Sequence, residues 1–206
     1  KALSSDGRCK TLDSSADGYG RGEGYAALHL QPADSKSCSS AASSAVYLAG
    51  TAVNQDGRSS TFTAPFGPSQ QGLMLEALTD AHITPVDVRY LSMHGTGTSL
   101  GDPIEIGSAG GVLHDSVSVV LGASKSFLGH TEGAAGVSGL LFAIVSASSL
   151  TASSIRHCRK MNPHVEATLE SLNSLNKMTF AAPRSACTPL GVACCELEES
   201  QFYLSY

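Results

Sequence analysis

The stretch R-Y-L-S-M-H-G-T-G-T-S-L-G-D-P-I-E, residues 89–105, holds the patterns of a strand, a loop and a helix start, from which the fold class can be inferred. Its first five residues are typical of a short strand that ends at His94. Its last four residues begin a helix, with Asp102 as N-cap, a proline in the first position and Glu105 in the third, and this helix is predicted to run to about Leu113. A glycine-rich loop joins the two elements. The chain therefore presents a histidine at the end of a strand.

The same order returns further along the chain. V-S-V-V-L at 117–121 predicts a buried strand, and G-A-S-K-S-F-L-G-H-T-E at 122–132 predicts a second histidine loop. Thr131 is predicted to cap the apolar helix that follows. Two strands joined through a helix are parallel with a right-handed crossover, which brings both loops to the carboxyl edge of one sheet. We therefore expect an α/β fold in which His94 and His130 converge.

Weaker sequence patterns precede the two histidine loops. Residues 45–52 are predicted to form a strand, residues 53–69 a long polar loop, and residues 70–82 a helix with its apolar side chains on one side. T-P-V-D at 84–87 has the residues of a helix start but is too short for more than a turn. The glycines at 18, 20, 22 and 24 lack the spacing of a dinucleotide site and predict tight turns and close approach of backbones.

The amino-acid composition of the chain limits the classes of binding partner that are expected. The chain of 206 residues is long enough to bury a core, and its 42% hydrophobic and 15% charged residues are typical of a globular protein. A net charge of −5 disfavours nucleic acid or an anionic membrane surface and favours a small-molecule or protein partner. The most apolar run, at 139–145, is too short to cross a bilayer, so no membrane span is predicted.

The six cysteines show no C-x-x-C pair, and no secretory signal opens the sequence, which together predict a reducing, cytoplasmic setting. One reading groups a histidine with three cysteines as a zinc site, namely His157, Cys158, Cys187 and Cys194. Their spacing matches no standard ligand pattern, so scattered small apolar thiols are favoured and no metal site is predicted.

A histidine in such a loop can act as a general base, a metal ligand, an oxyanion donor or a structural residue. Here each histidine is followed by a helix start, whose positive dipole end favours the neutral imidazole. A neutral ring N–H suits a carbonyl oxygen that is becoming an enolate or oxyanion. A metal pair would need a third ligand, and the carboxylates Asp102 and Glu132 are better explained by the helix starts. Lys125 can reach the same pocket or pair with Glu132, which would fix His130.

At this point the residues resemble a family, the ketosynthase (β-ketoacyl synthase) domains of type I polyketide synthases, with the condensing enzymes of fatty acid biosynthesis as relatives. The resembling motifs run in the family's order: D-G-R-C-K-T-L-D-S-S-A-D-G-Y-G-R-G-E-G at 6–24, G-T-A-V-N-Q-D-G-R-S-S at 50–60, T-A-P-F-G-P-S-Q at 63–70, H-G-T-G-T-S-L-G-D-P-I-E at 94–105, K-S-F-L-G-H-T-E-G-A-A-G at 125–136 and M-N-P-H-V at 161–165.

The resemblance implies a thiolase-like fold with five layers (α-β-α-β-α), of which this chain would hold mostly the C-terminal half. It implies residues 1–44 as the end of the N-terminal half, residues 45–182 as the C-terminal half, and residues 183–206 as a degenerate or truncated tail. Family members are homodimers that transfer an acyl group from the phosphopantetheine of an acyl carrier protein to a cysteine. They then condense it with a malonyl-type thioester and release CO₂. No cofactor is bound directly, and adjacent synthase domains are further partners.

The resemblance also implies residue roles. His94 and His130 resemble the pair that binds the malonyl thioester carbonyl and stabilises the enolate. Lys125 resembles the lysine that supports the second histidine, and Thr96 and Thr98 resemble the threonines that hydrogen-bond the pantetheine arm. Asp102 and Glu132 are predicted to support the two loops from their helix starts.

Two departures from the family pattern bear on activity. The nucleophilic cysteine, expected in a T-A-C-S-S motif upstream of the glycine run, is missing, so the chain is predicted to be a fragment that is inactive alone. Cys38 imitates that motif but lies on the wrong side of the glycine run, in the low-complexity segment 35–44. The glycine-rich loop expected near the end of the domain has no match in the tail.

Two other functions stay open. A non-catalytic ketosynthase-like partner, contributing dimer or pocket surface, is favoured by the degenerate tail and disfavoured by the two histidines and Lys125. A thiolase is less favoured because thiolases end with a second cysteine and lack this combination of motifs. The absence of G-x-S-x-G gives a serine hydrolase no support.

Overall fold

The computed structural model describes residues 2–32, 46–55, 65–116, 118–149, 151–172, 178–180, 192–196 and 200–205. Cys38 and Cys187 lie outside these residues, as do the whole low-complexity segment 35–44 and part of the predicted polar loop.

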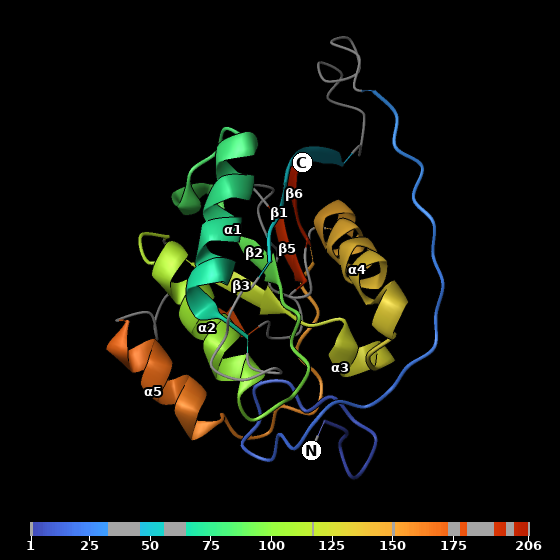
Figure 1. Ribbon diagram of the computed structural model, residues 1–206, viewed down its shortest axis with the longest axis vertical. Helices are drawn as coiled ribbons and strands as arrows, with labels where there is room; N and C mark the ends of the chain where they lie inside the picture. Colours follow the sequence, from blue (N-terminus) through green and yellow to red (C-terminus); the bar gives the residue numbers. More distant parts are fainter. Residues whose placement is uncertain are drawn as a thin grey trace.

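One mixed sheet of six strands runs through the centre of the molecule (Figure 1). In the spatial order β1-β6-β5-β2-β3-β4, β2 lies parallel to both β3 and β5, and β3 lies parallel to β4, whereas β6 is antiparallel to β5 and β1. The strands are β1 (Tyr47–Val53), β2 (Tyr90–Ser92), β3 (Val119–Gly122), β4 (Met178–Phe180), β5 (Val192–Glu196) and β6 (Ser200–Ser205). The tail predicted to be degenerate thus supplies two strands of this sheet.

Helices cover both faces of the sheet (Figure 1). On one face lie α1 (Gly67–Asp80), α2 (Gly101–Val112) and α5 (Pro163–Ser171), and on the other lie α3 (Lys125–Leu128) and α4 (Ala135–Ser149). Two short 3₁₀ helices complete the described elements, η1 (Pro85–Asp87) and η2 (Glu132–Ala134). The helix–sheet–helix arrangement provides three of the five layers that the family resemblance implies.

The side chains of β2 point alternately to the two faces of the sheet, and the hydrophobic core accordingly has two parts. Leu91 is 1% exposed and packs with Leu121, Ile106 and other apolar residues on the side of α1, α2 and α5. Tyr90 faces the opposite way and packs with α4, where Leu140 is buried. Successive side chains of a strand point to opposite faces of the sheet. A strand that is buried on both faces therefore has a continuous run of apolar residues in its sequence, as predicted for the parallel centre of the sheet.

The predicted order of strand, histidine loop and helix occurs twice and is confirmed, and so is the parallel pairing of β2 and β3. The predicted strand at 45–52 and helix at 70–82 are β1 and α1, with shifted bounds. Helix α1 begins three residues early because a proline near its first position starts the helix there. The turn at 84–87 is confirmed, with the reciprocal capping contacts of Thr84 and Asp87.

One predicted cap is wrong, and the other holds only for its position. The N-cap of α2 is Leu100, and Asp102 lies inside the first turn, where its carboxylate makes the tertiary contacts described below. Thr131 is the N-cap residue of the 3₁₀ helix η2, which precedes α4, but its side chain makes no capping bond.

Residues 2–32 contain no helix or extended strand and run beneath the histidine loops. The Asp13 carboxylate anchors this segment by accepting the backbone N–H groups of Arg159 at 2.6 Å and Lys160 at 3.0 Å. Burial alone would raise the pKa of Asp13, but the hydrogen bonds from the Ser15 side chain and from these backbone groups outweigh it and hold the pKa well below the usual range.

Helix α4 is the most apolar element. The stretch Glu132–Ser149 has a mean hydropathy of 1.3, and by length and composition alone it meets the requirement for a membrane span. Core helices of folded domains meet the same requirement, and α4 packs Leu140 and Ala143 against the sheet. Its outer side leaves Val145 63% exposed, and Leu128 of the adjoining α3 is 55% exposed.

Candidate active site

The two histidine loops meet at the carboxyl edge of the sheet. His94 follows β2 and His130 follows α3, and their rings lie edge to face with centroids 5.4 Å apart and planes at 88°. The side chains are almost buried, at 9% and 7% exposure. The predicted convergence of His94 and His130 is therefore confirmed.

A buried carboxylate holds the backbone of the first histidine. The Glu105 carboxylate accepts the N–H of His94 at 2.6 Å and the N–H of Gly95 at 2.9 Å. The residue order predicted a helix-capping position for Glu105, whereas its side chain points back from α2 to the end of β2. Glu105 is thus a site residue that local pattern missed.

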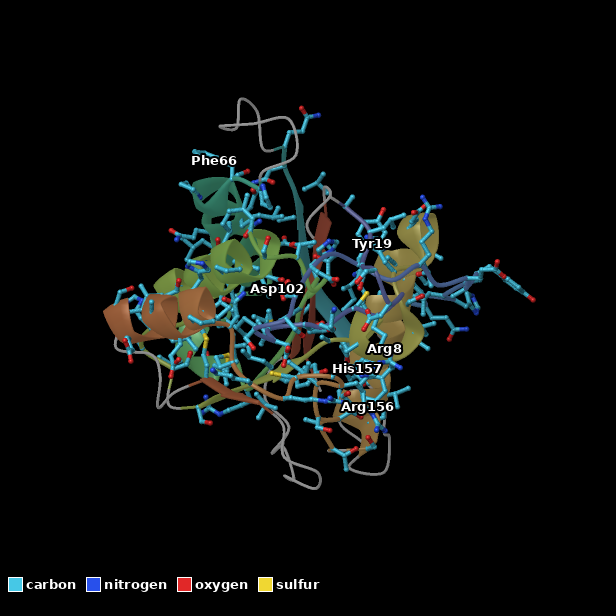
Figure 2. All side chains as sticks on the ribbon, turned by 90° about the horizontal axis from the view of Figure 1, so that it is seen from below. Arg8, Tyr19, Phe66, Asp102, Arg156 and His157 are labelled. Carbon is cyan, nitrogen blue, oxygen red and sulfur yellow. The ribbon has the colours of Figure 1, made fainter. Side chains whose placement is uncertain are left out.

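Asp102 makes the corresponding contacts one step along the loop. One oxygen accepts the N–H of Gly97 at 3.1 Å, and the other accepts the N–H of Leu12 at 2.7 Å. Asp102 is fully buried, close to the centre of the view in Figure 2. It supports the loop as predicted, but by tying it to the segment 2–32 and not by capping α2.

Burial raises the pKa of both carboxyl groups. The pKa of Glu105 rises to about 7, chiefly by desolvation, with a further contribution from the charge of Asp102. The pKa of Asp102 rises to about 6 for the same main reason. Backbone hydrogen bonds act in the opposite direction at both residues, because N–H donors favour the ionised form.

The tautomer of His130 follows from one hydrogen bond. The backbone N–H of Glu132 donates to Nδ1 of His130 at 3.0 Å, so Nδ1 is an acceptor and the ring proton of the neutral imidazole sits on Nε2. Glu132 makes this contact from a left-handed backbone conformation, at φ 49°. Its contact with His130 is therefore made by its backbone, while its carboxylate lies 3.6 Å from Arg21 in an ion pair that is more than half exposed.

Lys125 is 3% exposed at the start of α3. Its positive charge acts to lower the pKa of Glu105 against the larger effect of burial, so Lys125 lies within electrostatic reach of the carboxylate that holds His94. Lys125 therefore acts electrostatically on the carboxylate of the first loop, and its predicted support of His130 stays a prediction.

The two threonines of the first loop lie together. The hydroxyl oxygens of Thr96 and Thr98 are 3.3 Å apart, and the Thr98 oxygen accepts the N–H of Gly101 at 3.1 Å. Thr96 is 7% exposed. Thr98 therefore helps to begin α2, and the predicted contact of both hydroxyls with a pantetheine arm stays a prediction.

The alternating glycines line the second loop, as close backbone approach requires. The N–H of His130 donates to the carbonyl of Gly20 at 2.7 Å, and the N–H of Gly22 donates to the carbonyl of His130 at 2.9 Å. A Cβ on Gly22 would lie 2.2 Å from the Leu128 carbonyl oxygen. Tyr19, in the same run, places its ring 4.9 Å from that of His130.

Two further kinds of group bear on the chemistry of the site, a buried thiol and possible metal ligands. Cys9 is 2% exposed, and burial raises the pKa of its thiol, which disfavours the thiolate that a nucleophile needs. In the described part of the chain, no group of three or more His, Cys, Asp or Glu residues could hold a metal ion. Cys187, one of the four residues of the possible zinc site, lies outside the described part.

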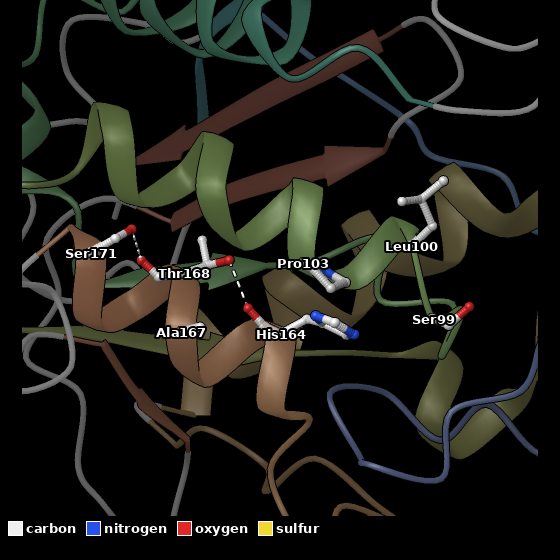
Figure 3. Close-up of a pocket in the computed structure, with 7 residues that line it drawn as sticks. All are labelled: Ser99, Leu100, Pro103, His164, Ala167, Thr168 and Ser171. Carbon is white, nitrogen blue, oxygen red and sulfur yellow. Dashed lines mark hydrogen bonds between the residues drawn. The ribbon is translucent and has the colours of Figure 1, made fainter.

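The structure also has an open groove on its outer surface, between the start of α2 and α5 (Figure 3). Its volume is about 470 Å³. It is lined by Ser99, Leu100, Pro103, His164, Ala167, Thr168 and Ser171. Neither His94 nor His130 lines it, so the groove is separate from the paired histidines.

Comparison with known proteins agrees with this geometry. Residues 45–159 match the family model "Beta-ketoacyl synthase, C-terminal domain", and residues 1–36 match "Beta-ketoacyl synthase, N-terminal domain". A phenolphthiocerol/phthiocerol polyketide synthase from Mycobacterium tuberculosis is 42% identical over 191 residues, which is 89% of this chain and 9% of that protein. The erythronolide synthase EryA3 of Saccharopolyspora erythraea is 38% identical over 85% of this chain and 6% of its own length.

Solved ketosynthases have the same fold. The ketosynthase from module 1 of the bacillaene synthase of Bacillus amyloliquefaciens matches all of this chain with a TM-score of 0.86 at 27% identity. That from module 6 of the Bacillus subtilis synthase matches with a TM-score of 0.84, also at 27% identity. The chain spans 38% of each of these structures, and less than a tenth of the two synthases above. The thiolase-like α/β fold is thereby confirmed, and the chain belongs to the β-ketoacyl synthase family, among the ketosynthases of polyketide synthases.

Proposed function

We propose that this chain forms the downstream part of a polyketide synthase ketosynthase, which catalyses acyl transfer and the decarboxylative condensation of malonyl-type thioesters. The observation that carries the proposal is the convergence of His94 and His130, with the ring proton of neutral His130 on Nε2. Two buried imidazoles in this arrangement suit one oxygen that gains negative charge during the reaction.

In this reaction the thioester carbonyl oxygen of the malonyl group accepts a hydrogen bond from Nε2–H of His130, and His94 contributes from the other side. When the carboxylate leaves as CO₂, the electron pair of the broken C–C bond forms the enolate, whose negative oxygen the two imidazoles stabilise. The enolate carbon then attacks the acyl thioester on a cysteine. The C–S bond breaks, and the thiolate of that cysteine leaves. The catalytic contribution of the pair is to lower the energy of the enolate.

The remaining residues hold this pair in place. Glu105 and Asp102 fix the backbone of the first loop, and Lys125 supplies a buried positive charge within electrostatic reach of Glu105. Thr96 and Thr98 lie on the same loop and would bind the phosphopantetheine arm that an acyl carrier protein delivers. Residues 1–44 and 45–182 are assigned to the two halves of the domain, and the nucleophilic cysteine to the upstream half.

The exposed apolar side chains of α3 and α4 support the view that further protein covers this face. Val145 and Leu128 are more than half exposed, and Val145 belongs to the apolar stretch Glu132–Ser149. The upstream ketosynthase half, or a second copy in a homodimer, would bury them. The same surface also favours the second candidate, a non-catalytic ketosynthase-like partner that contributes only dimer or pocket surface.

The test joins the chain to the upstream half of a polyketide synthase ketosynthase that carries the nucleophilic cysteine. Purified protein is given a labelled acyl thioester and a malonyl thioester on carrier protein, and covalent labelling, CO₂ release and β-ketoacyl product are measured. The proposal predicts all three. A folded dimer that is acylated but neither releases CO₂ nor forms product would support the non-catalytic partner. The chain offered alone should remain unlabelled, and stable acylation of Cys38 would contradict the assignment of the nucleophile.

A further inference from the structure

Tyr19 contacts the imidazole of His130 directly. The ring centroids are 4.9 Å apart and the planes are inclined at 56°. Tyr19 is half-buried, so its side chain is only partly shielded from solvent. Because Tyr19 stands between two glycines of the alternating run, its sequence context resembles a turn and does not mark it as a site residue.

The backbone on either side of Tyr19 is bound to both histidine loops. The N–H of Gly18 donates to the carbonyl of Gly97 at 3.1 Å, in the loop of His94. The carbonyl of Gly20 accepts the N–H of His130 at 2.7 Å. The N–H of Tyr19 itself donates to the carbonyl of Ala2 at 3.0 Å. The position of Tyr19 is therefore fixed relative to both loops at once.

The tilt of the His130 ring depends on what packs against the ring. The bond from the Glu132 N–H fixes the position of Nδ1 and the tautomer, whereas contacts with the face and edge of the ring act on the orientation of its plane. Tyr19 contacts the ring as a second support, and the edge-to-face arrangement with His94 provides a third. Aromatic rings have preferred mutual geometries, so these contacts favour one tilt of the plane.

We propose that Tyr19 is a positioning residue for His130, whose ring holds the imidazole plane so that Nε2–H points at the developing enolate oxygen. The inference rests on the proposed function of the histidine pair. Displacement by about 1 Å of a group that acts in the transition state is enough to lower a rate by up to about a hundredfold. Since the contact is made by the ring, phenylalanine should serve as well as tyrosine.

The test uses the chain joined to an upstream ketosynthase half, with malonyl carrier protein as substrate. Tyr19→Ala, Tyr19→Phe and the matched control Tyr25→Ala are compared, because Tyr25 lies in the same segment and is 100% exposed. Tyr19→Ala should lower kcat for CO₂ release by about tenfold or more, with KM and the rate of cysteine acylation within about twofold of the unaltered protein. Tyr19→Phe and Tyr25→Ala should stay within about twofold in all three quantities.

The outcomes separate positioning from folding. A purely structural role would lower acylation and CO₂ release together, so a loss confined to kcat for CO₂ release supports the inference. Should Tyr19→Ala fail to acylate, Tyr19→Leu, which keeps an apolar side chain without a planar ring, decides the question by the same criteria. Unchanged kcat in the acylating Ala or Leu variant, or an equal loss in Tyr19→Phe, would overturn the inference. The variant His130→Ala distinguishes failure of the proposed function from failure of the role of Tyr19. If His130→Ala leaves CO₂ release unchanged, the proposed function is wrong. If His130→Ala abolishes CO₂ release while Tyr19→Ala does not lower it, only the role of Tyr19 is wrong.

Discussion

The carboxylate of Glu105 accepts the backbone N–H of His94 at 2.6 Å, and its second oxygen accepts the next N–H along the chain at 2.9 Å. A side chain on α2 thus fixes the peptide that carries the histidine of the first loop. Both contacts are buried, so water cannot replace either of them. The position of the His94 imidazole therefore depends on a residue eleven positions away that has no direct part in the chemistry.

Glu105→Gln should destabilise the fold and slow decarboxylation. An amide offers one acceptor oxygen in place of two, so one of the two buried N–H groups loses its acceptor and faces an NH₂ group. We expect a loss of about 1–3 kcal/mol in the free energy of unfolding by urea, with at least a tenfold loss in the rate of CO₂ release. Glu170→Gln, at an exposed position on α5, is the matched control and should change neither quantity. Equal behaviour of the two variants would contradict the assigned role.

Stability should fall as pH rises from about 5 to about 7. Burial raises the pKa of Glu105 from 4.5 to about 7 and that of Asp102 from 3.8 to about 6. In this window the folded state binds more protons than the unfolded state, so increasing pH favours unfolding. The pKa of Asp13 is lowered, and that group contributes in the opposite direction only at more acid pH. Urea midpoints between pH 5 and 8 measure the slope, and Glu105→Gln should make it shallower. A slope identical in both proteins would show that Glu105 does not titrate in this range.

Gly22→Ala should disrupt the support beneath His130. The added Cβ would lie 2.2 Å from the Leu128 carbonyl oxygen, which belongs to backbone and cannot rotate away. Overpacking of this kind costs about 1–3 kcal/mol, and here it also separates two hydrogen-bonded segments. Gly72→Ala is the control, because nothing lies within 4 Å of its Cβ and alanine favours a helix, so that variant should unfold at equal or higher urea concentration. A Gly22→Ala protein as stable as the unaltered chain would contradict the close approach.

The exposed apolar residues of α3 and α4 should make the isolated chain associate. Leu128→Lys together with Val145→Lys places charges where the side chains are 55% and 63% exposed, and light scattering should then show less self-association. In the protein joined to its upstream half, the same pair should weaken assembly because charges would be buried in the new contact. Leu75→Lys on α1, at 49% exposure, is the matched control on the opposite face. Equal effects of both sets would indicate that no specific surface is involved.

The central sheet and the convergence of the histidines could be predicted from the sequence, because both follow from strands and helices that alternate along the chain. Asp102 and Glu105 were misread as helix caps, since the residue order around 102–105 is that of a helix start. Their actual partners include Leu12, ninety residues away, which no local pattern reveals. Helix α3 escaped prediction because four residues show no period. The role of Glu132 was assigned to its carboxylate, while its backbone N–H makes the contact with His130.

The alternating glycines at 18, 20, 22 and 24 could be interpreted from the sequence only in part. Its alternation predicted close approach of backbones, and Gly20 and Gly22 do lie against carbonyl groups of Gly7 and Leu128. The identity of those segments, and the contact of Tyr19 with His130, depend on how residues 2–32 cross beneath the loops. That path has no helix or extended strand from which it could have been inferred.

His94 and His130 are proposed to stabilise the enolate together. The decisive measurement is CO₂ release from malonyl carrier protein in His94→Ala and His130→Ala variants of the chain joined to its upstream half, with cysteine acylation measured in the same preparations. Each variant should lose at least about a hundredfold in CO₂ release, as the loss of one oxyanion donor typically does, while acylation persists. Release of CO₂ at an unchanged rate from either acylating variant would rule out the proposed role of the pair.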